Sequence, residues 1–206
     1  MKQGVIILFC ILMLTSCDGI KYGRSQEFYN NIRKELPDSL FNNFPKKVSS
    51  TYVPFCLIWP ASLVNNGSYC GIFIKQNVDD SDFDSEYKKL LNKAVYVTHW
   101  GDSCVVGIKE WRSDNKIKKT RLSCSKKLYI VPEYLDETNP FNKWSPGLDI
   151  SSSAEILVQS CSPGRYLPDE YLLDNDFLPE GYSHGYSKGM IIDKSQKLIT
   201  HWLIVW

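Results

Sequence analysis

The chain has 206 residues, with 24 lysines and arginines against 23 aspartates and glutamates, and 43% of its residues are hydrophobic. This balance excludes the basic excess that drives non-specific nucleic-acid binding, so no nucleic-acid partner is expected. The hydrophobic share excludes an intrinsically disordered chain, and the length suits one domain with a substantial core.

The N-terminus has the order of a secretory signal. Lys2 supplies a positive charge, residues 5–14 form an unbroken apolar run, and Leu14-Thr15-Ser16-Cys17 ends the segment. An apolar helix of this length extends about 15 Å, roughly half of the hydrocarbon core of a bilayer. A permanent membrane-spanning helix is therefore not expected here.

The segment Leu14-Thr15-Ser16-Cys17 resembles the lipobox of bacterial lipoproteins. The resemblance implies that residues 1–16 are a signal peptide and that Cys17 is the lipidated first residue of the mature chain. It also implies a membrane partner through the acylated Cys17, because two or three acyl chains anchor a protein stably. The expected location is the bacterial cell envelope, with the periplasmic face of the outer membrane, the cell surface and the inner membrane as destinations. Asp18 resembles the inner-membrane retention signal of enterobacterial lipoproteins.

Residues 17–25 contain two glycines and no apolar periodicity, so they are predicted to form a lipidated tether. A single globular domain is expected over 26–206. It begins with two stretches of helical spacing, at Phe28, Ile32 and Leu36 and at Leu40, Phe41 and Phe44. Asp38-Ser39-Leu40 resembles the O-glycosylation acceptor motif of Bacteroidetes; the alternative interpretation is that Asp38 or Ser39 caps a short helix after Pro37.

Runs of β-branched and aromatic residues predict strands along most of the domain, at 51–59, 69–75, 94–99, 103–111, 127–131 and 154–161. The first two are expected to pair, and residues 82–93 have the pattern of an amphipathic helix. A long loop is expected over 162–189. A C-terminal hairpin is expected around Lys194-Ser195-Gln196. The predicted fold class is α+β, with N-terminal helices packed on a mostly antiparallel sheet that ends in this hairpin.

Five cysteines follow Cys17, namely Cys56, Cys70, Cys104, Cys124 and Cys161. They form no CxxC motif, so no zinc site is predicted. Disulfides are allowed outside the cytoplasm, and Cys56 with Cys70 or Cys104 with Cys124 are the candidate pairs. The alternative is that the cysteines are buried free thiols, and the odd number leaves at least one thiol in either case.

The sequence contains no GxSxG, HExxH or P-loop motif, and no catalytic residue or cofactor is predicted. Among the three histidines, His99 and His201 lie in strand-like apolar runs. His184 differs because it lies in Gly181-Tyr182-Ser183-His184-Gly185-Tyr186, a loop-like segment rich in glycine and aromatic residues. A nucleophilic cysteine beside this histidine is the enzymatic alternative.

Aromatic residues are abundant, with six tryptophans, twelve tyrosines and nine phenylalanines. Flat aromatic side chains stack on sugars and anchor protein interfaces. The candidate residues for binding a ligand or partner are Trp144, Tyr182, His184 and Tyr186.

These observations favour a membrane-anchored lipoprotein with a non-enzymatic domain that binds a protein or glycan partner. An immunity-type protein that neutralises a toxin belongs to this class. The alternatives are an envelope hydrolase that uses a Cys/His pair and a structural envelope component.

Overall fold

In the computed structural model, the structure describes residues 20–22, 26–34, 36–47, 55–57, 70–99, 101–108, 124, 127–132, 153–169, 172, 178 and 181–206. The predicted lipidation site Cys17 and the binding candidate Trp144 lie outside these residues. The elements in chain order are β1 (Ile20–Tyr22), α2 (Gln26–Arg33), the 3-10 helix η1 (Asp38–Phe41), β2 (Phe55–Leu57), β3 (Cys70–Asn77), α3 (Asp80–Leu91), β4 (Tyr96–His99), β5 (Val105–Ile108), β6 (Tyr129–Pro132), β7 (Glu155–Pro163), β8 (Gly185–Asp193) and β9 (Leu198–Val205).

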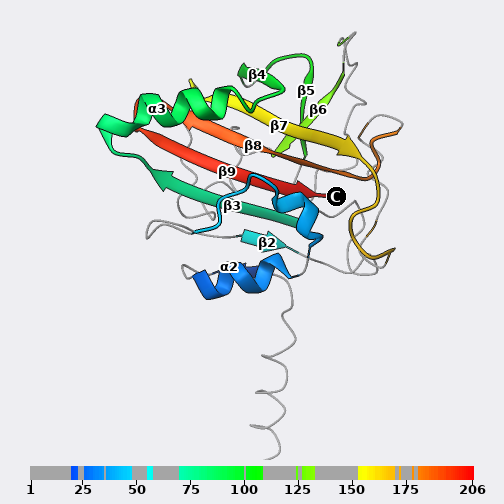
Figure 1. Ribbon diagram of the computed structural model, residues 1–206. Helices are drawn as coiled ribbons and strands as arrows, with labels where there is room; N and C mark the ends of the chain where they lie inside the picture. The colour runs from blue at the N-terminus through cyan, green and yellow to red at the C-terminus, as the bar shows by residue number, and fades with distance from the viewer. Residues whose placement is uncertain are drawn as a thin grey trace, which may run out of the picture.

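A five-stranded sheet organises the domain (Figure 1). Its strand order is β3-β9-β8-β7-β4, and every neighbouring pair is antiparallel. Two smaller pairs accompany it, the antiparallel pair β1-β2 and the parallel pair β5-β6. Strands β3 and β4 form the two edges of the main sheet.

The predicted fold class is wrong, because the described residues are mostly sheet rather than a sheet under a layer of N-terminal helices. Of the two stretches with helical spacing, the first forms α2, which has only eight residues. The second forms only the four-residue η1, since Pro37 and Pro45 confine it and proline cannot continue a helix. The longer helix, α3, follows β3 and is not N-terminal.

The short helix after Pro37 has no side-chain cap. Asp38 is already in the first turn of η1, and no side chain makes a capping hydrogen bond to it. The interpretation that Asp38 or Ser39 caps this helix is therefore wrong. Both side chains are exposed, whereas Leu40 is buried.

The C-terminal hairpin is present as β8 and β9. The carboxylate oxygen Oδ1 of Asp193 accepts hydrogen bonds from the backbone N–H and the hydroxyl of Ser195, at 3.0 and 2.6 Å, and from the N–H of Gln196. Lys197 completes the turn in the left-handed region, with φ of 51°. Strand β9 has a neighbour on each side, and all of its side chains are buried, including Thr200 and His201.

Two other sequence predictions differ from the structure. The predicted partners 51–59 and 69–75 do not pair in the described ladders, since β2 pairs with β1 and β3 pairs with β9. The predicted loop 162–189 is shorter than expected, because β7 continues to Pro163 and β8 begins at Gly185. In addition, β1 lies inside the segment predicted to be a tether.

The main sheet is covered on both faces. On the helix face, α3 packs Phe83 and Leu90 against Leu157, Met190, Ile192 and Ile199. Tyr29, Leu36, Leu40, Phe41 and Phe44 of the N-terminal segment pack on Ile72, Ile74, Leu203 and Val205. On the opposite face, Ile130 and Val131 of β6 pack on Ile156, Ile191 and Trp202. No helix among the described residues is long and apolar enough to cross a bilayer.

Candidate functional site

The predicted binding residues Tyr182 and Tyr186 lie on opposite faces of the sheet. Tyr182 packs on the cluster around Trp202 and Trp206, and its carbonyl oxygen accepts a 2.8 Å hydrogen bond from Trp206 Nε1. Tyr186 belongs to the helix face, where its hydroxyl lies 2.8 Å from Ser160 Oγ. The two tyrosines therefore do not form one binding surface.

His184 lies just before β8 and is half-buried. Its carbonyl oxygen accepts a 3.0 Å hydrogen bond from the N–H of Gly164, which fixes the backbone beside the end of β7. The backbone of His184 thus extends the pairing of β7 with β8 beyond Pro163 and Gly185.

The Cys104–Cys124 disulfide confirms one of the two predicted cysteine pairs. It joins the start of β5 to the segment that leads into β6, and these two strands run parallel. Cys124 Sγ lies 3.9 Å from the carbonyl oxygen of Lys127. This distance is a contact and not a hydrogen bond, because a disulfide sulfur has no hydrogen to donate. The structure describes the backbone of Cys56 and Cys70 but not their side chains, so the other predicted pair stays a prediction.

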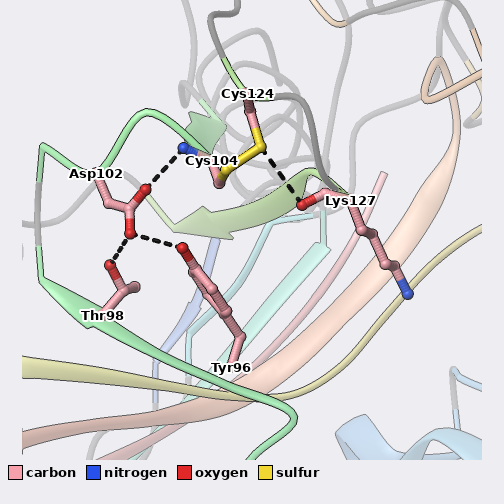
Figure 2. The surroundings of a disulfide bond; sticks show 6 residues. All are labelled: Tyr96, Thr98, Asp102, Cys104, Cys124 and Lys127. Atoms are coloured by element: carbon pink, nitrogen blue, oxygen red, sulfur yellow. Dashed lines mark hydrogen bonds between the residues drawn. A yellow bond between two sulfur atoms is a disulfide. The ribbon is translucent and has the colours of Figure 1, made fainter.

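Asp102 gathers three donors beside this disulfide (Figure 2). Its Oδ2 accepts hydrogen bonds from the hydroxyls of Tyr96, at 2.7 Å, and Thr98, at 2.6 Å. Its Oδ1 accepts a 2.8 Å hydrogen bond from the N–H of Cys104. The hydrogen bond to Asp102, together with burial, raises the pKa of Tyr96. The carboxylate thus ties β4 to the disulfide, a structural role rather than a reactive one.

A second polar cluster lies where β7 begins, opposite the end of β4. Glu155 accepts hydrogen bonds from Tyr87, at 2.7 Å, and Lys194, at 2.8 Å. Burial alone raises the pKa of Glu155, but the hydrogen bonds from Lys194 and Tyr87 outweigh it and hold that pKa below its usual value. The Lys194 ammonium also lies 4.5 Å from the centre of the Tyr87 ring. These contacts favour the charged forms of Glu155 and Lys194 and the neutral form of Tyr87. Glu155 and Lys194 therefore form an ion pair that joins the start of β7 to the turn between β8 and β9.

Two basic side chains are buried beneath the N-terminal segment. Lys188 Nζ donates hydrogen bonds to the carbonyl oxygens of Leu40, at 2.9 Å, and Asn42, at 2.8 Å. His201 lies nearby, with its ring centre 6.1 Å from that of Phe44. Burial lowers the pKa of Lys188, and burial with a contribution from Lys93 lowers the pKa of His201 to about 4.

Cys161 is a free cysteine, and it is buried. The N–H of Ile130 donates to its sulfur at 3.4 Å. Burial raises the pKa of the thiol, which disfavours the thiolate that a nucleophile requires. Within the described part of the chain, no group of three or more His, Cys, Asp or Glu side chains is placed to hold a metal ion.

An open hollow of about 470 Å³ lies at the C-terminal end of α2. We call it the α2 hollow, and the described residues that line it are Asn30, Arg33, Lys34, Leu36 and Asp38. None of these residues was predicted from the sequence to bind a ligand or partner, although Leu36 belongs to a predicted helical stretch and Asp38 to the motif that resembles an O-glycosylation acceptor. The available signal was the pair of adjacent basic residues, Arg33 and Lys34, between Ile32 and Leu36 of the first stretch with helical spacing.

No protein family, curated protein or solved structure matches this chain. Its function is therefore argued from its own residues.

Proposed function

We propose that the chain is a membrane-anchored envelope lipoprotein whose domain binds a protein or glycan partner without catalysing a reaction. The lipobox-like segment that ends in Cys17 is the basis for the anchor. The Cys104–Cys124 disulfide is the observation that carries the proposal. Disulfides persist in the periplasm and at cell surfaces and are rare in the cytoplasm, so this bond supports an exported domain.

The hydrolase alternative requires an accessible thiolate beside a histidine. Cys161 does not meet this requirement, because only 2% of its surface is exposed and burial raises its pKa. Cys104 and Cys124 are consumed by the disulfide. The alternative thus depends on Cys56 or Cys70.

An exposed apolar edge supports a protein partner. Val95 is 60% exposed and Val97 is 43% exposed, and Val97 belongs to β4 at one edge of the sheet. No residue of β4 is a lysine, glutamate or proline, the residues that commonly block an edge strand against pairing with another chain. A partner that presents an extended segment would add to this edge through main-chain hydrogen bonds.

The anchor is tested by metabolic labelling with a fatty-acid precursor. The wild-type chain should incorporate the label, Cys17→Ala should not, and Cys161→Ala should retain it as a matched control. Persistent labelling of Cys17→Ala would contradict the proposed anchor.

The binding role is tested by cross-linking in intact cells, followed by a pull-down from detergent-solubilised envelope. Val95→Ser/Val97→Ser changes exposed side chains and should reduce recovery of the specific partner, while Lys88→Gln on α3 should not. Trp144→Ala and His184→Ala test the two remaining predicted residues in the same way. Absence of any specific partner, or equal recovery by all of these variants, would contradict the proposed surfaces.

A further inference from the structure

The α2 hollow carries two cations, Arg33 and Lys34. The guanidinium carbon of Arg33 lies 4.8 Å from the centre of the Phe41 ring and 5.8 Å from that of Tyr29. Lys34 is exposed, and its ammonium donates a 3.2 Å hydrogen bond to Asn31 Oδ1. Among the described residues, neither cation forms a salt bridge with a carboxylate. Their charge is therefore available to an anion that enters the hollow.

The arginine is also held in place. Tyr29 is buried, and its hydroxyl donates a 2.6 Å hydrogen bond to the carbonyl oxygen of Pro45. The rings of Tyr29 and Phe41 lie 6.5 Å apart in an edge-on arrangement, and both belong to the core cluster of the helix face. A guanidinium supported by fixed aromatic rings loses little freedom when it binds, and its planar fork matches two oxygens of a phosphate.

Two more cations lie near the other end of α2. The side-chain amide of Gln26, at the start of the helix, donates a 3.1 Å hydrogen bond to the carbonyl oxygen of Lys46. Lys46 and Lys47 are both exposed. The N-terminal segment therefore presents cations near the beginning of α2 as well as at its end.

The position of α2 along the chain places it close to any anchor at Cys17. Gln26, the first residue of α2, lies nine positions after Cys17. A fully extended chain of this length spans about 30 Å. In Figure 1, α2 lies beyond the β3 edge of the main sheet, away from α3 and β4. The cations of α2 thus belong to the part of the domain nearest in sequence to the bilayer.

We propose that the α2 hollow binds the phosphate of an anionic phospholipid headgroup in the bilayer that holds the anchor. The proposal rests on the proposed function, because the nearby anchor is what favours a lipid over a free phosphate. Arg33 binds phosphate oxygens through its fork, Lys34 adds a point charge, and Asn30 offers an amide donor. Among the described residues of the lining, Asp38 is acidic, and its charge weakens binding of an anion.

The experiment measures binding of the chain from residue 18 onward to phosphatidylglycerol-containing vesicles and to pure phosphatidylcholine vesicles, by co-sedimentation. This chain keeps every described residue and lacks the lipidated cysteine, so binding does not depend on acylation. Arg33→Gln/Lys34→Gln should weaken binding to the anionic vesicles by about 25-fold, since each surface cation contributes about a fivefold factor. Lys34→Gln alone, at an exposed position, should weaken it about fivefold.

Two further variants test whether binding depends on the charge of the α2 hollow. Asp38→Asn should tighten binding to the anionic vesicles about fivefold, because it removes a like charge. Lys88→Gln/Lys89→Gln removes a matched pair of cations from the last turn of α3 and should change binding less than twofold, since that helix covers another part of the sheet.

Several outcomes would overturn the proposal. These are equal losses for the α2 and α3 pairs, equal binding to both kinds of vesicle, or complete competition by inorganic phosphate at the same phosphorus concentration. The last result would assign the α2 hollow to a soluble phosphate ligand. Labelling of Cys17 is measured separately, so failure of the headgroup site is distinguishable from failure of the anchor.

Discussion

The ammonium of Lys188 donates a hydrogen bond to the carbonyl oxygen of Leu40, which lies 148 residues earlier in the chain. A second hydrogen bond to the carbonyl oxygen of Asn42 completes the connection. These carbonyls belong to the end of η1, so one lysine of β8 attaches the N-terminal segment to the middle of the sheet. The two hydrogen bonds hold the end of η1 against the helix face of the sheet.

Lys188→Met should lower the free energy of unfolding by about 2 kcal/mol, because the buried carbonyl oxygen of Leu40 and the partly buried one of Asn42 lose their donor. Methionine keeps the length and apolar stem of the side chain, so little packing is lost. Lys89→Met is the matched control on the exposed surface of α3, with an expected change within about 0.5 kcal/mol. Denaturant unfolding measures both. An unchanged or more stable Lys188→Met would show that the cost of burying the ammonium exceeds the gain from its hydrogen bonds.

His201 should make the domain sensitive to acid. Its pKa in the folded state is lowered to about 4, mainly by burial, whereas an unfolded histidine titrates near 6.5. Below pH 6.5 the unfolded state binds a proton that the folded state rejects, so the free energy of unfolding falls as pH decreases from about 6.5 to 4. The full difference is about 3 kcal/mol.

Chemical denaturation across this pH range tests the assignment. His201→Phe should flatten the profile between pH 6.5 and 4, since phenylalanine has no proton to bind and can pack on Phe44. An unaltered slope in His201→Phe would assign the acid sensitivity to other groups.

Local sequence patterns predicted individual elements better than their arrangement. The amphipathic pattern of residues 82–93 predicted α3, and the turn residues Lys194-Ser195-Gln196 predicted the C-terminal hairpin of β8 and β9; both predictions are confirmed. Strand pairing was not predictable in the same way, because the local pattern of β3 contains no information that its partner is β9. The N-terminal helices were overestimated because helical spacing also occurs in a segment that prolines restrict to one 3-10 turn.

The predicted binding residues show that closeness in the sequence does not imply a shared surface. Tyr182, His184 and Tyr186 lie close together in the sequence, but the chain bends at residues 183 and 184 before β8 begins, and the two tyrosines pack on opposite faces. The cations of the α2 hollow were visible only as adjacent basic residues. The hollow that they line, and the rings of Tyr29 and Phe41 that support Arg33, depend on contacts between segments.

The disulfide should contribute substantially to stability. Cys104 and Cys124 are 20 residues apart, and closing a loop of this length in the unfolded chain corresponds to about 3 kcal/mol in the loop-entropy model. Cys104→Ser/Cys124→Ser should lower the free energy of unfolding by roughly this amount, as measured by denaturant titration. Cys161→Ala is a control that removes a thiol outside the disulfide. Titration of unfolded, non-reduced protein with a thiol reagent should label Cys161 and not Cys104 or Cys124, and labelling of these two would contradict the bond.

Gly189 marks the closest packing between β8 and its neighbours. A Cβ atom at this position would overlap the carbonyl oxygen of Leu157 and the buried ring of Trp202. Neither group has room to move, because Trp202 is fully buried and Leu157 lies inside the sheet. Gly189→Ala should therefore destabilise the domain by about 3 kcal/mol or more, at the upper end of the effects of overpacking a core.

Gly181→Ala is the matched control for this glycine, since it has positive φ of 85° and no heavy atom within 4 Å of its Cβ position. It should cost about 1 kcal/mol, from backbone strain alone. Thermal unfolding of the two variants compares the cost of steric overlap at Gly189 with the cost of backbone strain at Gly181. A Gly189→Ala variant as stable as Gly181→Ala would mean that Trp202 does not lie against the backbone of β8 as described.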